Sequence, residues 1–120
     1  MPELTQDSAN AIVASYRALQ TEALDVSPGL SAPEQFAFRA VELGLEEPGF
    51  AWNEWEPVQT REYEQPEFAA GADAETLKRL MTAHVRTERF VGGHLDRMQA
   101  EGVLEAIVDR LEALAEADEI

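Results

Sequence analysis

The sequence contains no cysteine and only one lysine, Lys78, among its 120 residues. The absence of cysteine excludes disulfide bonds, thiolate metal sites and a cysteine nucleophile, and leaves histidine and carboxylate side chains as metal ligands. No apolar run approaches the roughly 18 residues that a membrane-spanning helix requires. The first residues also lack a basic region followed by an apolar one. We therefore expect a cytoplasmic protein with no leader and no membrane segment.

Acidic residues far outnumber basic ones. The chain carries 24 Asp and Glu against 9 Lys and Arg, so its formal net charge is −15 and its pI is near 4.3. Apolar residues still make up 45% of the chain, which is enough to build one core. We therefore expect a single folded domain over residues 1–120.

The acids are spread along the whole length, and eight of the nine basic residues are arginine. This pattern is typical of a protein adapted to a high-salt cytosol, where screening weakens repulsion between like charges. The alternative is an acidic surface that imitates nucleic acid or docks on a basic partner.

Hydrophobic periodicity predicts four to five helices and hence a mainly α-helical, single-domain bundle. Helix-start residues support this prediction: Ser31 precedes a proline, and Asp73 precedes a long apolar stripe. Gly44 is a natural helix stop. The expected helices cover about residues 8–24, 33–43, 73–91 and 103–117, with a short segment at 94–99.

Residues 46–72 show no clear period and are divided by three prolines and two glycines. We expect mostly loop there, with a minor β element in residues 50–63 as the alternative. Both tryptophans, Trp52 and Trp55, lie in this stretch. Such aromatic residues most often close a small core, and the alternative is an exposed anchor for a partner.

The basic residues gather in one place, residues 77–99, where five of them face only two acids. The net charge of this stretch is +3, and that of the rest is −18. The simplest interpretation is pairing with the chain's own carboxylates. The alternative is a site for a phosphate, a carboxylate ligand or a protein partner, and its candidate residues are Arg79, Arg86, Arg89, Arg97, Trp52 and Trp55.

Glu88 falls within the apolar stripe of the predicted 73–91 helix, one turn after His84. A carboxylate directed at a core needs a partner, so we predict a structural buried pair of His84 and Glu88, with a contact between Glu88 and an arginine as the other structural interpretation. The alternative adds His94 to make a metal or acid–base cluster, although this spacing matches no known ligand pattern. No Gly-rich phosphate loop, nucleophile elbow or HExxH motif occurs, so the sequence predicts no catalytic residue, metal or cofactor.

Two comparisons bear on the last third of the chain. The helix order over residues 73–117 is like that of a helix-turn-helix DNA-binding domain, but its presumed recognition segment, residues 94–101, is short and acidic.

The run Arg86-Thr-Glu-Arg89-Phe90-Val-Gly-Gly93, followed by Glu101-Gly102-Val-Leu and a terminal helix, resembles a family of small uncharacterised prokaryotic proteins. In that family an Arg-Phe-x-x-Gly step precedes a terminal helix. The resemblance implies a helical architecture and no assigned activity, and the acidic balance suggests a haloarchaeal member.

These observations favour a non-enzymatic binding or protein-interaction module adapted to high salt, with an unidentified protein as partner. The alternative is a nucleic-acid-associated regulator or an acidic nucleic-acid mimic, and an enzyme ranks third. A charge of −18 outside the basic stretch opposes the counterion release that nucleic-acid binding needs. Convergence of the candidate arginines and tryptophans on one concavity would favour ligand binding.

Overall fold

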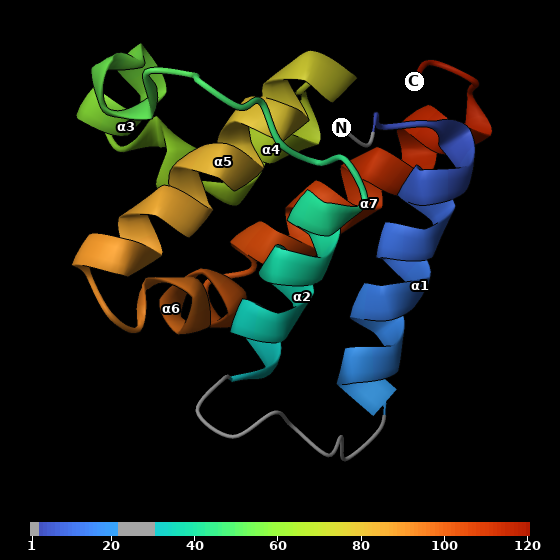
Figure 1. The fold of residues 1–120 in the computed structure, drawn as a ribbon, viewed down its shortest axis with the longest axis horizontal. Coiled ribbons are helices and arrows are strands. Elements are labelled where there is room, and N and C mark those ends of the chain that lie inside the picture. Colours follow the sequence, from blue (N-terminus) through green and yellow to red (C-terminus); the bar gives the residue numbers. More distant parts are fainter. Residues whose placement is uncertain (1–2, 22–30) are drawn as a thin grey trace.

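A computed structural model describes residues 3–21 and 31–120, and every regular element among them is helical (Figure 1). The expected mainly α-helical fold is confirmed, and the described residues contain no strand. None of the described helices is long and apolar enough to cross a membrane. In chain order the elements are α1 (Gln6–Thr21), α2 (Ala32–Glu42), η1 (Trp52–Glu54), α3 (Glu56–Gln59), η2 (Glu62–Glu64), α4 (Pro66–Ala70), α5 (Ala74–Phe90), α6 (His94–Ala100) and α7 (Val103–Glu116).

The helix starts predicted at Ser31 and Asp73 are confirmed. The Ser31 hydroxyl accepts a hydrogen bond from the Glu34 amide, and the Glu34 carboxylate accepts one from the Ser31 amide, which forms a capping box before α2. Asp73 caps α5 by accepting a hydrogen bond from the Thr76 amide at 2.8 Å. Beyond α2, Gly44 has a φ of 106°, as expected of a helix stop. The predicted end of the first helix, at residues 22–24, lies outside the described residues.

The expectation of loop or short strands in residues 46–72 was wrong. This stretch holds two 3₁₀ turns, η1 and η2, and two short α-helices, α3 and α4. Each of these elements is three to five residues long, which is too short to show a helical period in the sequence. Pro57 and Pro66 lie in the first turns of α3 and α4, where a fixed φ and a missing N–H favour helix initiation.

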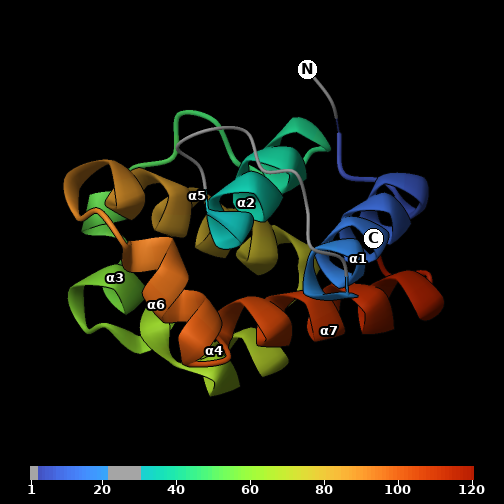
Figure 2. The same cartoon turned by 90° about the horizontal axis from the view of Figure 1, so that it is seen from below.

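The longer helices are arranged around α7. Helices α1 and α2 run side by side in opposite directions, and α7 passes beneath them in the second view (Figures 1 and 2). Helix α4 packs on α7 from the other side, while α5 contacts α2, α6 and the η1 turn. The turn between α5 and α6 therefore lies beside the aromatic stretch that begins at η1.

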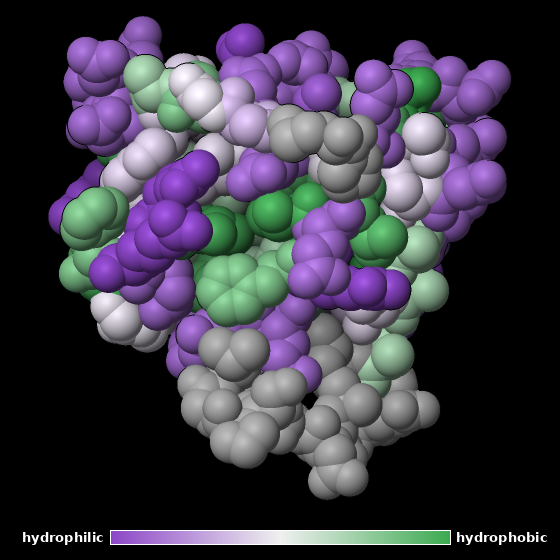
Figure 3. All heavy atoms as spheres, in the orientation of Figure 1, coloured by the Kyte–Doolittle hydropathy of each residue, from purple (hydrophilic) through white to green (hydrophobic). Residues whose placement is uncertain are grey.

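One apolar cluster runs through the molecule and includes residues from all of the longer helices. Phe36 of α2 is fully buried and meets Tyr16 of α1 edge to face, with ring centroids 5.0 Å apart. Two hydrogen bonds from Arg17 to Glu112, at 2.7 and 2.8 Å, join α1 to α7 at the surface. Polar side chains cover most of the rim of the face seen in Figure 3, with apolar residues gathered at its centre.

Candidate binding site

A concavity of about 380 Å³ lies between the chain segment 49–53 and the end of α5. It is lined by residues 49–53 together with Arg86, Arg89 and Phe90, and we call it the arginine–aromatic pocket. Its volume falls in the range of small-molecule sites, which is about 300 to 1,000 Å³. Three of the six candidate binding residues, Arg86, Arg89 and Trp52, thus line one concavity.

Helix α5 supplies the cationic wall of the pocket. Its apolar stripe, which includes Leu77 and Leu80, is fully buried against the core. Arg86, Arg89 and Phe90 follow one another at i, i+3 and i+4, so they share a different face of the helix. The same amphipathic pattern that buries one side of α5 therefore presents these three side chains together at the surface.

A stacked pair of aromatic rings joins the segment 49–53 to the end of α5. The Trp52 ring lies 6.2 Å from the Phe90 ring with an interplanar angle of 26°. Trp55 turns away from the pocket and packs edge to face on Phe50 at 5.4 Å and on Phe68 at 5.9 Å. Both tryptophans are half-buried and pack against the core, as expected of aromatic residues that close a small core, and Trp52 also lines the pocket.

Arg79 and Arg97 do not line the pocket, because the chain's own carboxylates hold them. Arg79 Nε lies 3.2 Å from Glu47 Oε2, and its guanidinium stands over the Phe50 ring at 5.4 Å. Arg97 bonds to Glu64 at 2.9 Å, and this hydrogen bond raises the pKa of Arg97. The interpretation that the basic residues pair with the chain's own carboxylates therefore applies to Arg79 and Arg97.

Arg86 and Arg89 differ from Arg79 and Arg97 in having no such partner. Among residues 3–21 and 31–120, neither has a carboxylate oxygen within 4.0 Å. Next to them Phe90 is 78% exposed and Val91 is 53% exposed. Within the described part of the chain, two arginines without an ion pair thus lie beside exposed apolar side chains, a combination typical of a contact surface.

The predicted pair of His84 and Glu88 is corrected by the structure. The Glu88 carboxylate accepts hydrogen bonds from the Gly93 amide at 3.0 Å and the Leu95 amide at 2.8 Å, and so caps the start of α6. His84 instead lies 2.9 Å from His94, measured between Nδ1 and Nε2. The physical reason is the turn at Gly92–Gly93, which folds α6 back and brings His94 over His84.

The two histidines form a neutral, buried cluster. Arg97 approaches His94 Nδ1 at 3.5 Å and can only donate, so the His94 proton belongs on Nε2, from which it points to His84 Nδ1. The His84 proton then belongs on Nε2, which is buried and has no hydrogen-bond partner among the described residues. Burial, helped by the neighbouring His94, lowers the pKa of His84 to about 3.

This cluster has a structural geometry. The Tyr63 ring stacks on both imidazoles, at 4.7 Å from His84 and 5.9 Å from His94. His84 has no exposed surface from which to meet a substrate. Within the part of the chain that the structure describes, no three His, Cys, Asp or Glu side chains are grouped as a metal site.

The model of a family of unknown function, DUF6508, matches residues 2–117, which is nearly the whole chain. The chain belongs to the DUF6508 family. The expected membership of a family without an assigned activity is thereby confirmed. The chain shows no significant similarity to a curated protein or to a solved structure.

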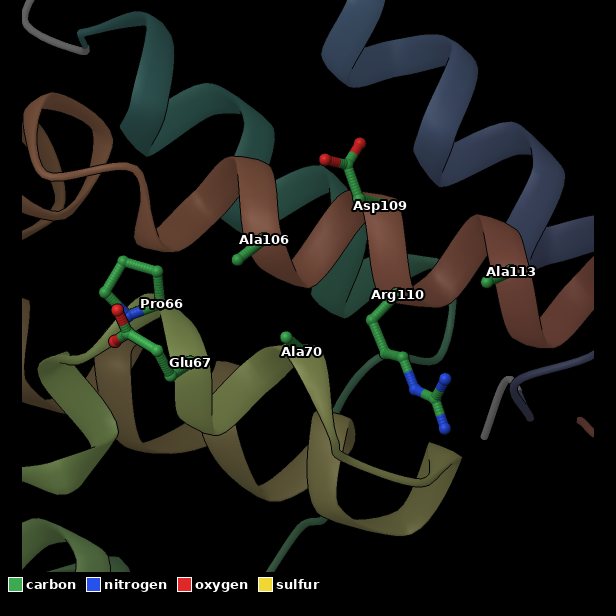
Figure 4. A pocket seen from close by; sticks show the side chains of 7 residues that line it. All are labelled: Pro66, Glu67, Ala70, Ala106, Asp109, Arg110 and Ala113. Atoms are coloured by element: carbon green, nitrogen blue, oxygen red, sulfur yellow. The ribbon is translucent and has the colours of Figure 1, made fainter.

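This DUF6508 protein also has a shallow groove between α4 and α7, which the sequence did not reveal. The groove has a volume of about 400 Å³, and small side chains such as Ala70, Ala106 and Ala113 form its floor (Figure 4). Arg110 lies at one end and donates a hydrogen bond from Nε to the Ala72 carbonyl at 2.7 Å. The alanine residues lie on two separate helices and give no sequence signal of a groove, because alanine is common wherever helices pack together.

The helix-turn-helix interpretation of residues 73–117 does not fit the DUF6508 structure. Its presumed recognition segment is α6, which is seven residues long. His94, Leu95 and Met98 of this helix are buried in the core. Its exposed face carries Asp96 and Arg97, and Arg97 is paired with Glu64 at 2.9 Å, so this short face offers little positive charge to DNA.

Proposed function

We propose that this DUF6508 protein is a non-enzymatic protein-interaction module adapted to high salt, and that the arginine–aromatic pocket binds an acidic partner. The convergence of Arg86, Arg89 and Trp52 on one concavity carries this proposal. Guanidinium groups bind carboxylates through paired hydrogen bonds, and tryptophan and arginine are the residues that dominate binding energy at interfaces. The exposed Phe90 and Val91 add apolar area beside the cations.

A protein partner suits this surface better than nucleic acid does. Nucleic-acid affinity comes mainly from several phosphate contacts, each of which releases counterions. Here Arg79 and Arg97 are already paired with Glu47 and Glu64, which leaves two cations at the pocket of a strongly acidic chain. An acidic segment with an apolar side chain would complement both the charge of Arg86 and Arg89 and the exposed Phe90.

Charge reversal at the pocket tests the interaction. A fluorescent peptide of alternating Glu and Phe should bind the protein in an anisotropy titration, and Arg86→Glu with Arg89→Glu should weaken it at least about tenfold. The reason is that each charge-assisted hydrogen bond contributes about 1.5 to 3 kcal/mol. The matched control is Arg39→Glu with Arg61→Glu, which changes the net charge equally away from the pocket and should alter affinity less than about twofold.

Equal losses in the pocket variant and the control variant would show that only the overall charge matters, and would contradict the proposal. Binding of random duplex DNA in place of the peptide, lost in the pocket variant alone, would instead favour the nucleic-acid alternative. In that case the affinity should fall steeply as salt is raised.

Adaptation to high salt predicts that the thermal stability of the protein rises with salt concentration. Self-repulsion among 24 acidic residues destabilises the compact state, and added salt screens it, so the Tm should keep rising between about 0.3 and 2 M KCl. Each kcal/mol of relieved repulsion raises the Tm by about 2 to 8 °C. The measurement is a series of thermal melts by circular dichroism. A plateau already at 0.3 M would contradict the adaptation.

A variant with fewer charges provides the control for these melts. Four exposed glutamates, each without an ion pair among the described residues, can be changed to glutamine together: Glu54, Glu62, Glu105 and Glu116. The variant has a net charge four units less negative, so its Tm should depend less steeply on KCl. An unchanged slope would assign the salt effect to apolar burial rather than to screening.

A further inference from the structure

We infer that the group which enters the arginine–aromatic pocket is an oxyanion carried on a flat ring. The oxyanion, a carboxylate or a phosphate, lies against Arg86 and Arg89, and the ring lies against Trp52. This inference rests on the proposed function and names the chemistry of its ligand.

The aromatic lining of the pocket and the open space at Gly49 favour a flat apolar group. Phe50, Trp52 and Phe90 all line the pocket, and the Trp52 and Phe90 rings already stack on one another at 6.2 Å with an interplanar angle of 26°. Gly49 and Ala51 of the facing segment have little or no side chain, and a Cβ built on Gly49 meets no atom within 4 Å. The space at Gly49 is therefore open, and a flat ring placed in this pocket would meet aromatic side chains, which pack on other rings by offset stacking or edge to face.

The positive charge of the two arginines in the pocket favours an anionic group on that ring. A guanidinium presents a rigid fork of donors that matches the two oxygens of a carboxylate or the oxygens of a phosphate. Arg86 and Arg89 lie one turn apart on the same face of α5, so both forks border the same concavity. Neither of them has an internal carboxylate among the described residues, so these donors are available to a ligand.

The size of the pocket limits the ligand to one ring with its acidic group. A volume of about 380 Å³ is near the lower end of small-molecule sites. A free aromatic acid and a partner chain that ends in an aromatic residue both supply a ring and an oxyanion. The shared chemistry is the inference, and the choice of probes separates the two sources.

Single-tryptophan variants report on the pocket directly. Trp55→Phe leaves Trp52 as the only tryptophan, and Trp52→Phe leaves Trp55, which does not line the pocket. N-acetylphenylalanine should change the fluorescence of the Trp52 variant in a saturable way and leave that of the Trp55 variant unchanged. N-acetylphenylalanine amide, which lacks the charge, and acetate, which lacks the ring, should each bind at least about tenfold more weakly, because each loses one half of the contact.

The same titration identifies the acid and its source. Tighter binding of phenyl phosphate than of N-acetylphenylalanine would identify the oxyanion as phosphate. Tighter binding of a short peptide with a free C-terminal phenylalanine would identify a chain end, and weaker binding of that peptide would identify a free acid. Each of these results supports the pairing of ring and oxyanion.

Arginine variants complete the test. Arg86→Gln and Arg89→Gln, made in the Trp55→Phe background, should each weaken N-acetylphenylalanine at least about fivefold, whereas Arg61→Gln should leave its affinity unchanged. Arg89 and Arg61 are exposed and Arg86 is half-buried, so far-UV circular dichroism should show all three variants folded. Equal affinity for the acid and its amide, equal affinity for the acid and acetate, or full binding by the arginine variants would overturn the inference.

The failure of this inference and of the proposed function are distinguishable. If no small probe binds while the Glu–Phe peptide still binds the wild-type chain and not the Arg86→Glu, Arg89→Glu variant, the interaction surface stands. The ring and oxyanion pairing is then wrong. If the peptide also fails to bind, the proposed function is overturned.

Discussion

Lowering the pH from 7 to 5 should reduce the free energy of unfolding by about 2 kcal/mol through His84 alone. Burial depresses its pKa from 6.5 to about 3 in the folded state, so below pH 6.5 the unfolded chain binds a proton that the folded chain excludes. The stability is present above pH 6.5 and is lost as the pH falls toward the folded pKa, at about 1.4 kcal/mol per unit. His94, whose pKa is also lowered by burial, acts in the same direction.

The window from pH 7 to 5 separates the histidines from most carboxylates. Hydrogen bonds to Arg17 and to Thr76 hold the pKa values of Glu112 and Asp73 below their usual ranges, so their contributions are lost only at lower pH. The titratable and charged groups near the cluster are Tyr63, Glu64, Glu88, Arg97 and Glu101. Urea titrations at pH 7, 6 and 5 measure the predicted change.

Two controls make the pH prediction specific. His84→Gln with His94→Gln should be less stable at pH 7 but nearly independent of pH down to 5, because neither protonation remains. NMR of the wild-type protein provides the second control, since the ring C–H signals of His84 should not shift between pH 7 and 5. A His84 signal that titrates near pH 6.5 would contradict the buried, neutral assignment.

Gly44→Ala should destabilise the protein by about 3 kcal/mol or more, whereas Gly102→Ala should cost about 1 kcal/mol. Both glycines have a positive φ, 106° and 83°, which costs a non-glycine residue about 1 to 3 kcal/mol. A Cβ on Gly44 would also lie 2.7 Å from the backbone of Glu3 and Leu4, whereas one on Gly102 meets no atom within 4 Å. The difference between the two variants therefore isolates the close approach of two backbones.

Denaturant titrations of the two glycine variants measure this difference. Hydrogen exchange at the start of α1 gives an independent readout, because residues 3 and 4 must shift to admit the new methyl group. The Gln6 side chain, which donates a hydrogen bond to the Ala115 carbonyl at 2.6 Å, should lose protection with them. Equal losses of stability in the two variants would mean that the N-terminal segment moves aside at no cost.

The sequence by itself determined the helices that are long enough to show a period, and the side chains that begin them. Ser31 and Asp73 act locally, within three residues, so their capping roles follow from the sequence alone. The short helices α3 and α4 were missed, because four or five residues cannot display a helical repeat. The basic stretch was also evident from the sequence, since it depends only on composition.

Only the tertiary structure decided which of its arginines are free. Glu47 and Glu64, which neutralise Arg79 and Arg97, are 32 and 33 residues away in the chain, so no local pattern reveals those pairs. The partner of His84 was mispredicted for a related reason. A spacing of four residues suggests contact along one helix, but the turn at Gly92–Gly93 places His94 closer, while Glu88 caps the next helix instead. The pocket exists because α5 and the segment 49–53 meet in space, and such a meeting is fixed by the packing of the whole core.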